Sequence, residues 1–264
     1  MIRYALEVEY DGSGFVGWQF QTTGLSVQQV LDQAASRLGA ATTQAAGRTD
    51  AGVHAAAQVV ALDLDRAIAP ERLLAALNFH LRPHRIAITR AALAPAGWDA
   101  RHAAIGRAYR YLILNRRAPP ALEAGRVWHV ERPLDAAAMH RAAQALLGRH
   151  DFTSFRATAC QARSPLRTID RLDVTRDGEH VRIEAAARSF LHHQVRNMVG
   201  SLVPIGQGRW PEPRLAEILA ARDRSAAGPT APPDGLTLTA IRYPADPFAP
   251  AAEATRADTG GRNR

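Results

Sequence analysis

A single carboxylate, Asp50, stands in a segment of small residues, AAGRTDAGVH, between Gly47 and Gly52 and two positions after Arg48. Glycine lets a backbone turn sharply or lets a ligand approach closely, so we expect Asp50 to be presented at a turn. A carboxylate so placed can act as a nucleophile, a base or a metal ligand. Metal binding is the weakest of these, because no other Asp or Glu lies within the ten residues before or the twelve after it. The alternative is a turn that carries a surface ion pair between Asp50 and Arg48.

The charge of the chain points to a polyanionic partner. Its 264 residues include 33 Lys and Arg against 25 Asp and Glu, a net charge of +8. The excess is nearly all arginine, whose planar guanidinium pairs with phosphates and stacks on bases, which favours nucleic acid over a membrane surface. A drift in base composition from lysine to arginine is the alternative explanation.

Several protein classes are disfavoured by what the sequence contains. A single cysteine, Cys160, leaves no internal disulfide and no cysteine-based zinc site, and fits a reducing compartment as a small buried residue. The N-terminal MIRYALEVEY has frequent charges and no long apolar run, so we expect neither a signal peptide nor a membrane helix, and a cytoplasmic protein. GxxxxGK is absent and no cluster of cysteine and histidine ligands is visible in the sequence, so we expect no cofactor.

Hydrophobic periodicity predicts an α+β protein made of two similar halves. Strands and helices are expected in a β-α-β-β-α-β order over the first hundred residues. Five of these six elements are placed: a strand at 2–10, a helix from Ser26 to Gly39, a strand at 55–64, a helix from Pro70 and a strand at 85–93. The second half repeats this order at greater length: a strand at 107–114, a helix at 135–148, a hairpin turning at Asp177-Gly178, helices at 189–206 and 212–222, and a strand at 235–243. We expect domains at 1–103 and 104–245, and a disordered tail at 246–264.

The segment GRTDAGVHA closely resembles the catalytic segment of the tRNA pseudouridine synthase A family. Six further segments resemble that family in its expected order, so that the likeness covers roughly residues 2–244: YDGSGFVGWQFQ (10–21), LNFHLRP (77–83), WDARHAAIGRAYRYLI (98–113), DFTSFRA (151–157), SFLHHQVRNMVG (189–200) and APPDGL (231–236). The resemblance implies a pseudouridine synthase fold, with a central antiparallel sheet and a cleft between the halves. It also implies a homodimer that isomerises uridines 38–40 in the anticodon arm of tRNA without a cofactor.

The same resemblance implies roles for four residues. Asp50 would be the nucleophile, which attacks the sugar carbon that loses its base or stabilises that carbon as an ion. Arg196 would pair with the Asp50 carboxylate. Arg48 would hold the carboxylate ionised and oriented, or fill the gap left in the RNA stem. The ring of Tyr109 would stack on the target base while its hydroxyl moves a proton, although Tyr109 shares a strand face with Tyr111 and could instead be core. One acid suffices for this reaction, because the departing base itself re-attacks, whereas a hydrolase needs a second carboxylate to activate water.

Clusters of arginine with aromatic residues predict the RNA contacts. Together with Tyr109, the candidates are Trp98, Asp99, Arg101, His102, Arg107, Arg110, Gln161 and Arg163. We reject a metal site at His192 and His193, because adjacent residues of a helix diverge by about 100 degrees. His54 is expected to be a hydrogen-bonded neighbour of the site.

Two other functions remain open on the sequence. A non-catalytic RNA-binding protein would be indifferent to loss of Asp50, and the chain lacks the glycine-aromatic RNA-recognition signature. A nucleic-acid glycosidase would need an acid that activates water, for which Asp99 is the nearest candidate by motif.

Overall fold

The computed structural model describes residues 1–40 and 42–249 of the chain. Six elements form the N-terminal half: β1 (Ile2–Tyr10), α1 (Val27–Ser36), β2 (Thr43–Ala45), β3 (His54–Leu64), α2 (Pro70–His80) and β4 (Ile86–Leu93). Nine follow: β5 (Gly106–Leu114), β6 (Trp128–His129), α3 (Ala136–Ala143), β7 (Gly148–Asp151), β8 (Leu166–Asp177), β9 (His180–Ala187), α4 (Gln194–Gly206), α5 (Arg214–Ala221) and β10 (Leu236–Arg242). The N-terminal half has the predicted β-α-β-β-α-β order when the short β2 is counted, and α5 lies within the helix predicted at 212–222. The short β6 and β7 were not predicted.

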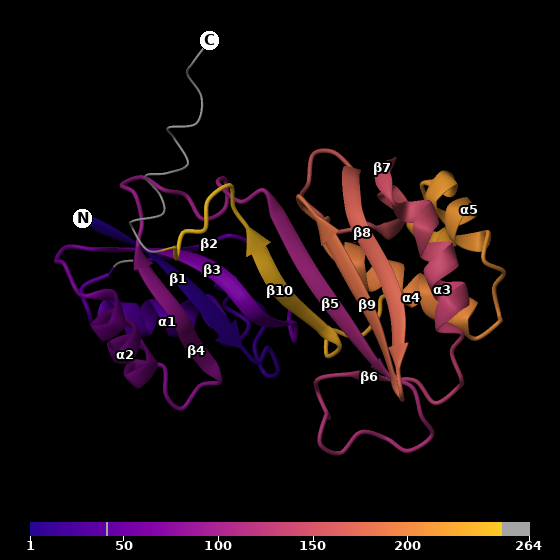
Figure 1. Ribbon diagram of the computed structural model, residues 1–264, viewed down its shortest axis with the longest axis horizontal. Helices are drawn as coiled ribbons and strands as arrows, with labels where there is room; N and C mark the ends of the chain where they lie inside the picture. Colours follow the sequence, from indigo (N-terminus) through magenta and orange to yellow (C-terminus); the bar gives the residue numbers. More distant parts are fainter. Residues whose placement is uncertain (41, 250–264) are drawn as a thin grey trace, which may run out of the picture.

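One largely antiparallel sheet runs through the whole molecule, in the order β4-β1-β3-β10-β5-β9-β8-β7 (Figure 1). The last strand, β10, lies in the middle, where it pairs parallel with β3 and antiparallel with β5. Helices α1 and α2 lie beside the strands of the N-terminal half, and α3, α4 and α5 lie beside those of the C-terminal half (Figure 1). The α+β class and the central antiparallel sheet are therefore as predicted.

Each half has its own hydrophobic core. Alternation along β1 buries Tyr4, Leu6 and Val8 against α1 and α2, and the side chain of Ser26 caps α1 by accepting from the Gln29 backbone N–H at 3.1 Å. The second core contains Tyr111 and the apolar side of α4, while Tyr109 is half-buried and packs against both cores. The strand that carries Tyr109 thus lies where the halves meet.

The largest departure from the predicted elements is at α4, which begins at Gln194 and not at Ser189. The reason is local: His193 takes a left-handed conformation (φ 62°, ψ 4°), and the Gln194 side chain accepts from the Leu191 backbone N–H at 2.8 Å, so 191–194 form a turn. The predicted helix at 135–148 is also shorter, because a 3₁₀ turn at 144–146 follows α3 and leads into β7.

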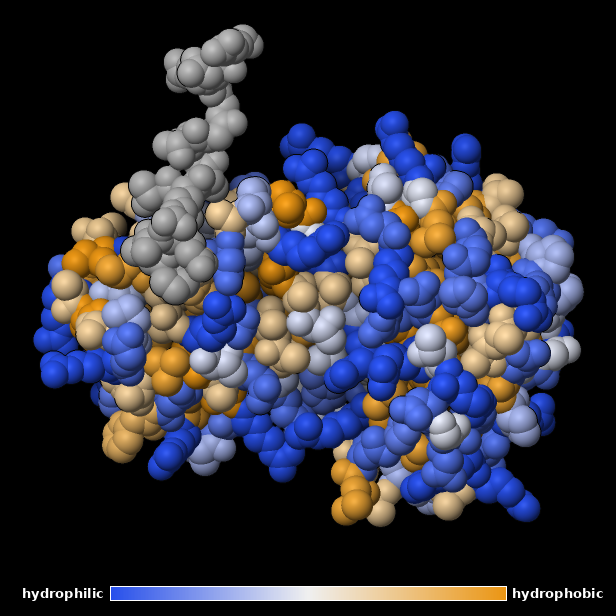
Figure 2. All heavy atoms as spheres, in the orientation of Figure 1, coloured by the Kyte–Doolittle hydropathy of each residue, from blue (hydrophilic) through white to orange (hydrophobic). Residues whose placement is uncertain are grey.

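The start of the predicted tail contacts β4. Asp246 pairs with Arg90 at 3.2 Å, and the Phe248 ring centroid lies 4.5 Å from the guanidinium carbon of Arg90. Residues 250–264 of that predicted tail lie outside the described residues. Within the described part of the chain, no helix is both long and apolar enough to cross a membrane. Hydrophilic residues cover much of the face shown in Figure 2, and hydrophobic residues form smaller patches between them.

Candidate active site

The turn between β2 and β3 presents Asp50 and is held by its own backbone. The Val53 N–H donates to the Asp50 carbonyl at 3.1 Å, which closes the turn. Gln58, fully buried on β3, donates its side-chain amide to the Gly47 carbonyl at 2.8 Å. A polar side chain buried so completely stabilises the fold only where it is hydrogen-bonded, so this bond fixes the start of the turn.

Segment 10–21 packs directly on this turn. The Trp18 N–H donates to the Thr49 carbonyl at 3.0 Å, and the Tyr10 hydroxyl is 2.8 Å from Thr49 Oγ1. Burial raises the pKa of Tyr10 to about 12, so its hydroxyl stays protonated. Gly17 has φ 108°, and a Cβ there would lie 2.8 Å from the Thr49 carbonyl oxygen. Only glycine therefore allows the two segments to approach this closely.

Segment 231–236 closes the other side of the turn through His54. A neutral His54 ring accepts from the Gly12 N–H at Nδ1 (3.0 Å) and donates from Nε2 to the Asp234 carbonyl (3.1 Å). His54 is thus a hydrogen-bonded neighbour of the site, as the sequence predicts. It joins segments 10–21 and 231–236 across the turn.

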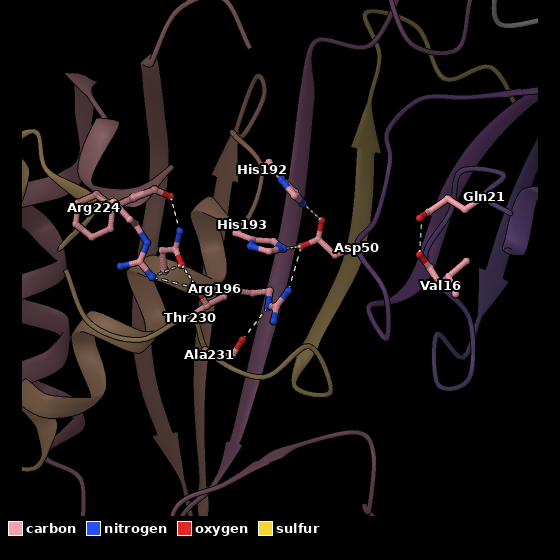
Figure 3. A network of polar contacts seen from close by, with 11 residues as sticks. Val16, Gln21, Asp50, His192, His193, Arg196, Arg224, Thr230 and Ala231 are labelled. Atoms are coloured by element: carbon pink, nitrogen blue, oxygen red, sulfur yellow. Dashed lines mark hydrogen bonds and ion pairs between the residues drawn. The ribbon is translucent and has the colours of Figure 1, made fainter. Parts of the chain in front are cut away.

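Arg196 reaches Asp50 from the first turn of α4. Its Nη1 is 3.4 Å from Asp50 Oδ2, and its Nε donates to the Ala231 carbonyl at 2.7 Å (Figure 3). The Ala231 N–H in turn donates to the Arg196 carbonyl at 3.1 Å. Within the described residues, Arg196 pairs with Asp50, whereas Arg48 is exposed and forms no ion pair.

The expectation that His192 and His193 diverge is wrong. Their rings lie 4.0 Å apart, and both point at Asp50: His192 Nε2 is 3.3 Å from Oδ1 and His193 Nε2 is 3.4 Å from Oδ2 (Figure 3). The 100-degree divergence applies only within a helix, and both residues precede α4. The polar Gln194, which caps the turn, is the sequence feature that could have placed the helix start there.

The grouping of these three residues meets one condition for a metal site. Ligand-type atoms of Asp50, His192 and His193 lie within 4.8 Å of one another. The guanidinium of Arg196 contacts the same carboxylate, however, and its positive charge opposes a cation at this position. The arrangement is better suited to orienting the Asp50 carboxylate.

The backbone of His193 is strained, and its ring is partly buried. A left-handed conformation costs a non-glycine residue roughly 1–2 kcal/mol, and such strain persists where surrounding contacts impose it. Burial lowers the pKa of His193; the Asp50 carboxylate opposes this, whereas His192, Arg196 and Arg224 lower the pKa further. His193 is therefore neutral at pH 7.

Tyr109 lies on β5, close enough to Asp50 for their charges to interact. Burial raises the pKa of Tyr109, and nearby Tyr10 and the Asp50 carboxylate raise it further. Its ring packs edge-on against Phe190, with ring centroids 5.4 Å apart. Tyr111, two residues further on, is fully buried and donates its hydroxyl to the Pro232 carbonyl at 2.8 Å. Tyr109 therefore lies at the site, whereas Tyr111 belongs to the core.

The predicted RNA-contact residues differ in exposure. Five are exposed: Arg101, His102, Arg110, Gln161 and Arg163. Trp98 is half-buried against Tyr243, with ring centroids 5.4 Å apart.

Arg107 and Asp99 are hydrogen-bonded within the protein. The guanidinium of Arg107 donates to the carbonyls of Ala46, Arg101, Ala104 and Arg188. Its contact with Ala46 links β5 to the start of the turn that carries Asp50. Asp99 accepts from the side chains of Gln44 and His102 at 2.9 Å each, and burial, which alone would raise its pKa, is outweighed by these bonds. The pKa of Asp99 is consequently lowered.

Comparison with known proteins gives one consistent result. Residues 7–102 and 142–244 match the family model described as tRNA pseudouridine synthase. The chain is 68% identical over 252 residues to tRNA pseudouridine synthase A of Acidiphilium cryptum (strain JF-5), covering 94% of this chain and 99% of the relative. It is 58% identical to the protein of that name from Rhodospirillum centenum (strain ATCC 51521 / SW), covering 92% of this chain and 100% of the relative.

Among solved structures the likeness is distant. The "Crystal Structure of a Cbf5-Nop10-Gar1 Complex" matches at 12% identity with a TM-score of 0.37, covering 89% of this chain and 48% of that one. The family match, which includes the turn of Asp50 and α4, and the identities to relatives over most of the chain are much stronger. The chain belongs to the tRNA pseudouridine synthase family.

Proposed function

We propose that the protein converts uridine to pseudouridine at positions 38–40 of the tRNA anticodon arm, with Asp50 as its nucleophile. The observation that carries this proposal is the environment of Asp50. A half-buried carboxylate is held on one side by Arg196, His192 and His193, on a turn built by three other segments of the chain. Membership of the family supplies tRNA pseudouridylation, and the resemblance of the GRTDAGVHA segment supplies the role of Asp50.

The reaction needs one carboxylate and a place for the detached base. Asp50 attacks the sugar carbon C1′ as the bond to uracil N1 breaks, which leaves the base free to rotate in the pocket. Uracil C5 then bonds to C1′ and Asp50 leaves; the proton on C5 is lost and N1 gains one, so no atom is added or removed. Positive and N–H donor groups around Asp50 favour its ionised form, which is the reactive one.

We assign Arg196, Tyr109 and Arg48 by the same resemblance, and the RNA contacts by the clustering of arginine with aromatic residues. Arg196 pairs with the Asp50 carboxylate and orients it. Tyr109 stacks on the target base, and Arg48, exposed beside the turn, fills the gap that the base leaves in the RNA stem. The exposed Arg101, His102, Arg110, Gln161 and Arg163 contact the RNA directly. Asp99 and Arg107 stabilise that surface through hydrogen bonds to Arg101, and Trp98 packs against Tyr243. The working enzyme is a homodimer.

A glycosidase that releases uracil is disfavoured by the environment of Asp99. Both of its oxygens accept hydrogen bonds from neighbouring side chains or backbone N–H groups, and its pKa is lowered. A carboxylate in that condition is a weak base for activating water. Formation of pseudouridine without free uracil distinguishes the two reactions.

The test is the Asp50→Asn variant, assayed on an unmodified tRNA transcript. We expect pseudouridine formation to be lost while tRNA affinity stays within about tenfold of wild type, because affinity comes from many phosphate contacts and only the chemical step needs the carboxylate. Asp65→Asn, at an exposed position outside the site, is the matched control and should react normally. Turnover by the Asp50→Asn variant, with deamidation excluded by mass spectrometry, would remove the nucleophile assignment.

A further inference from the structure

The two histidines before α4 are held by hydrogen bonds on both sides. The Ala157 N–H donates to the His192 carbonyl at 3.1 Å, and the Asn197 N–H donates to the His193 carbonyl at 2.9 Å. Asn197 is itself fully buried and donates its side-chain amide to the Phe155 carbonyl at 2.8 Å. The backbone that carries both rings is therefore fixed by segment 151–157 and by α4.

The rings of His192 and His193 contact both oxygens of the Asp50 carboxylate. His192 contacts Oδ1, while His193 and Arg196 contact Oδ2 (Figure 3). Contacts of 3.3–3.4 Å are long for hydrogen bonds, and such bonds in unliganded active sites tighten when substrate binds. Neither oxygen is left without a nitrogen neighbour.

We infer that His192 and His193 are positioning residues that orient the Asp50 carboxylate for attack, and that the left-handed backbone of His193 serves to turn both rings toward it. This inference rests on the proposed function of Asp50. In an ordinary helix, adjacent side chains point about 100 degrees apart, so the two rings could not both reach one carboxylate. The strained conformation brings them together.

A neutral imidazole at His193 suits this task better than a further cation. Arg196 already contributes one full positive charge beside Asp50, and Arg224 lies near enough to act on His193. A neutral His193 donates from Nε2 and orients the carboxylate without adding a charge that would have to be separated when Asp50 attacks.

The experiment distinguishes the contribution of the His193 ring from that of its left-handed backbone conformation. His193→Gly removes the ring but allows the left-handed conformation, and His193→Gln keeps an N–H donor at a similar reach. His193→Ala removes the ring and also disfavours the left-handed conformation. Arg222 is the other non-glycine residue with positive φ in the described chain (φ 49°), so Arg222→Gly is the matched control. Single-turnover rate, tRNA affinity and melting temperature are measured for each variant, with and without added imidazole.

We expect the Gly and Ala variants to lose roughly 10- to 100-fold in single-turnover rate, because a misplaced reacting group costs about that much. Affinity for tRNA and the melting temperature of the Gly variant should stay near wild type, while His193→Gln and added imidazole restore part of the rate. The double variant with His192→Ala should lose more, and Arg222→Gly should react like wild type.

Three results would overturn the inference. The first is a Gly variant within about twofold of wild type in rate; the second is a loss of rate that follows lost affinity or lost folding in every variant. The third is inactivation of wild type by a chelator with recovery on adding zinc, which would make the group a metal site. An active Asp50→Asn variant would instead contradict the proposed function, so the two failures are distinguishable.

Discussion

At the scale of single residues, the site surrounds one acid with nitrogen groups and one aromatic ring. Arg196 brings charge, His192 and His193 contact both carboxylate oxygens, and Tyr109 lies close enough for its ionisation to be opposed by Asp50. Because burial raises the pKa of Tyr109, its hydroxyl is protonated throughout the physiological pH range. Tyr109 can therefore donate a proton but is a poor general base at neutral pH.

Substitution of Tyr109 distinguishes stacking from proton transfer. A stacked ring is worth about 1–3 kcal/mol per base, so Tyr109→Phe keeps that contribution and Tyr109→Ala loses it. A hydroxyl that moves a proton contributes about 10²–10⁴-fold in rate, and we expect the Phe variant to lose activity on that scale with tRNA affinity retained. Single-turnover rates between pH 6 and 10 should show no alkaline loss that depends on this hydroxyl. A Phe variant that reacts like wild type would withdraw the proton-transfer role.

At the scale of elements, three segments converge on the turn between β2 and β3. Segment 10–21 approaches through Gly17, segment 231–236 through Asp234, and the start of α4 through Arg196. Each supplies a different constraint: a close backbone contact, a hydrogen bond to His54 and an ion pair. The position of Asp50 is thus set by packing between elements.

Gly17→Ala should impair both stability and catalysis, and Gly14→Ala is its matched control. Both glycines have positive φ, so both variants carry a backbone penalty of about 1 kcal/mol. A Cβ at Gly14 meets no atom within 4 Å, whereas at Gly17 it would lie 2.8 Å from the Thr49 carbonyl oxygen. We expect a larger loss of melting temperature in Gly17→Ala and a roughly tenfold or greater loss of single-turnover rate from displacement of the turn. Equal behaviour of the two variants would show that the close approach is unimportant.

At the scale of the whole molecule, the halves are joined by β10 and by Asp11. The buried Asp11 carboxylate contacts Arg85 of the N-terminal half at 3.1 Å and Arg126 of the C-terminal half at 3.0 Å. Burial alone would raise the pKa of Asp11, but hydrogen bonds from Ser13 and Arg85 outweigh it and lower the pKa to about 2. The ionised form is therefore stabilised by folding.

Asp11 should make the stability of the protein depend on pH in acid. Its pKa falls from 3.8 in the unfolded chain to about 2, so ionised Asp11 contributes about 2 kcal/mol to the free energy of unfolding above pH 5. That contribution is lost as pH falls from about 4 toward 2. Asp11→Asn should be destabilised by an amount of this order at pH 7 and by much less near pH 2, as measured by urea unfolding. The exposed Asp65→Asn is the control; a destabilisation of Asp11→Asn that does not vary with pH would contradict the linkage.

Local patterns in the sequence determined most of the elements and the turn that presents Asp50. Alternation marked β1, Ser26 marked the start of α1, and two glycines marked the turn of Asp50, because each of these signals acts between residues close in the chain. The family resemblance already pairs Arg196 with Asp50, whereas tertiary structure alone decided that His192 and His193 contact the same carboxylate. Arg196 lies 146 positions away, and the two histidines reach the carboxylate only because α4 begins at Gln194. Arg107 and Asp99 were likewise predicted as RNA contacts, and only the structure shows that both are hydrogen-bonded within the protein. The sequence pattern does not distinguish a histidine inside a helix from one just before it. The contacts that bring segments 151–157 and 191–197 to the turn between β2 and β3 therefore became evident only in the structure.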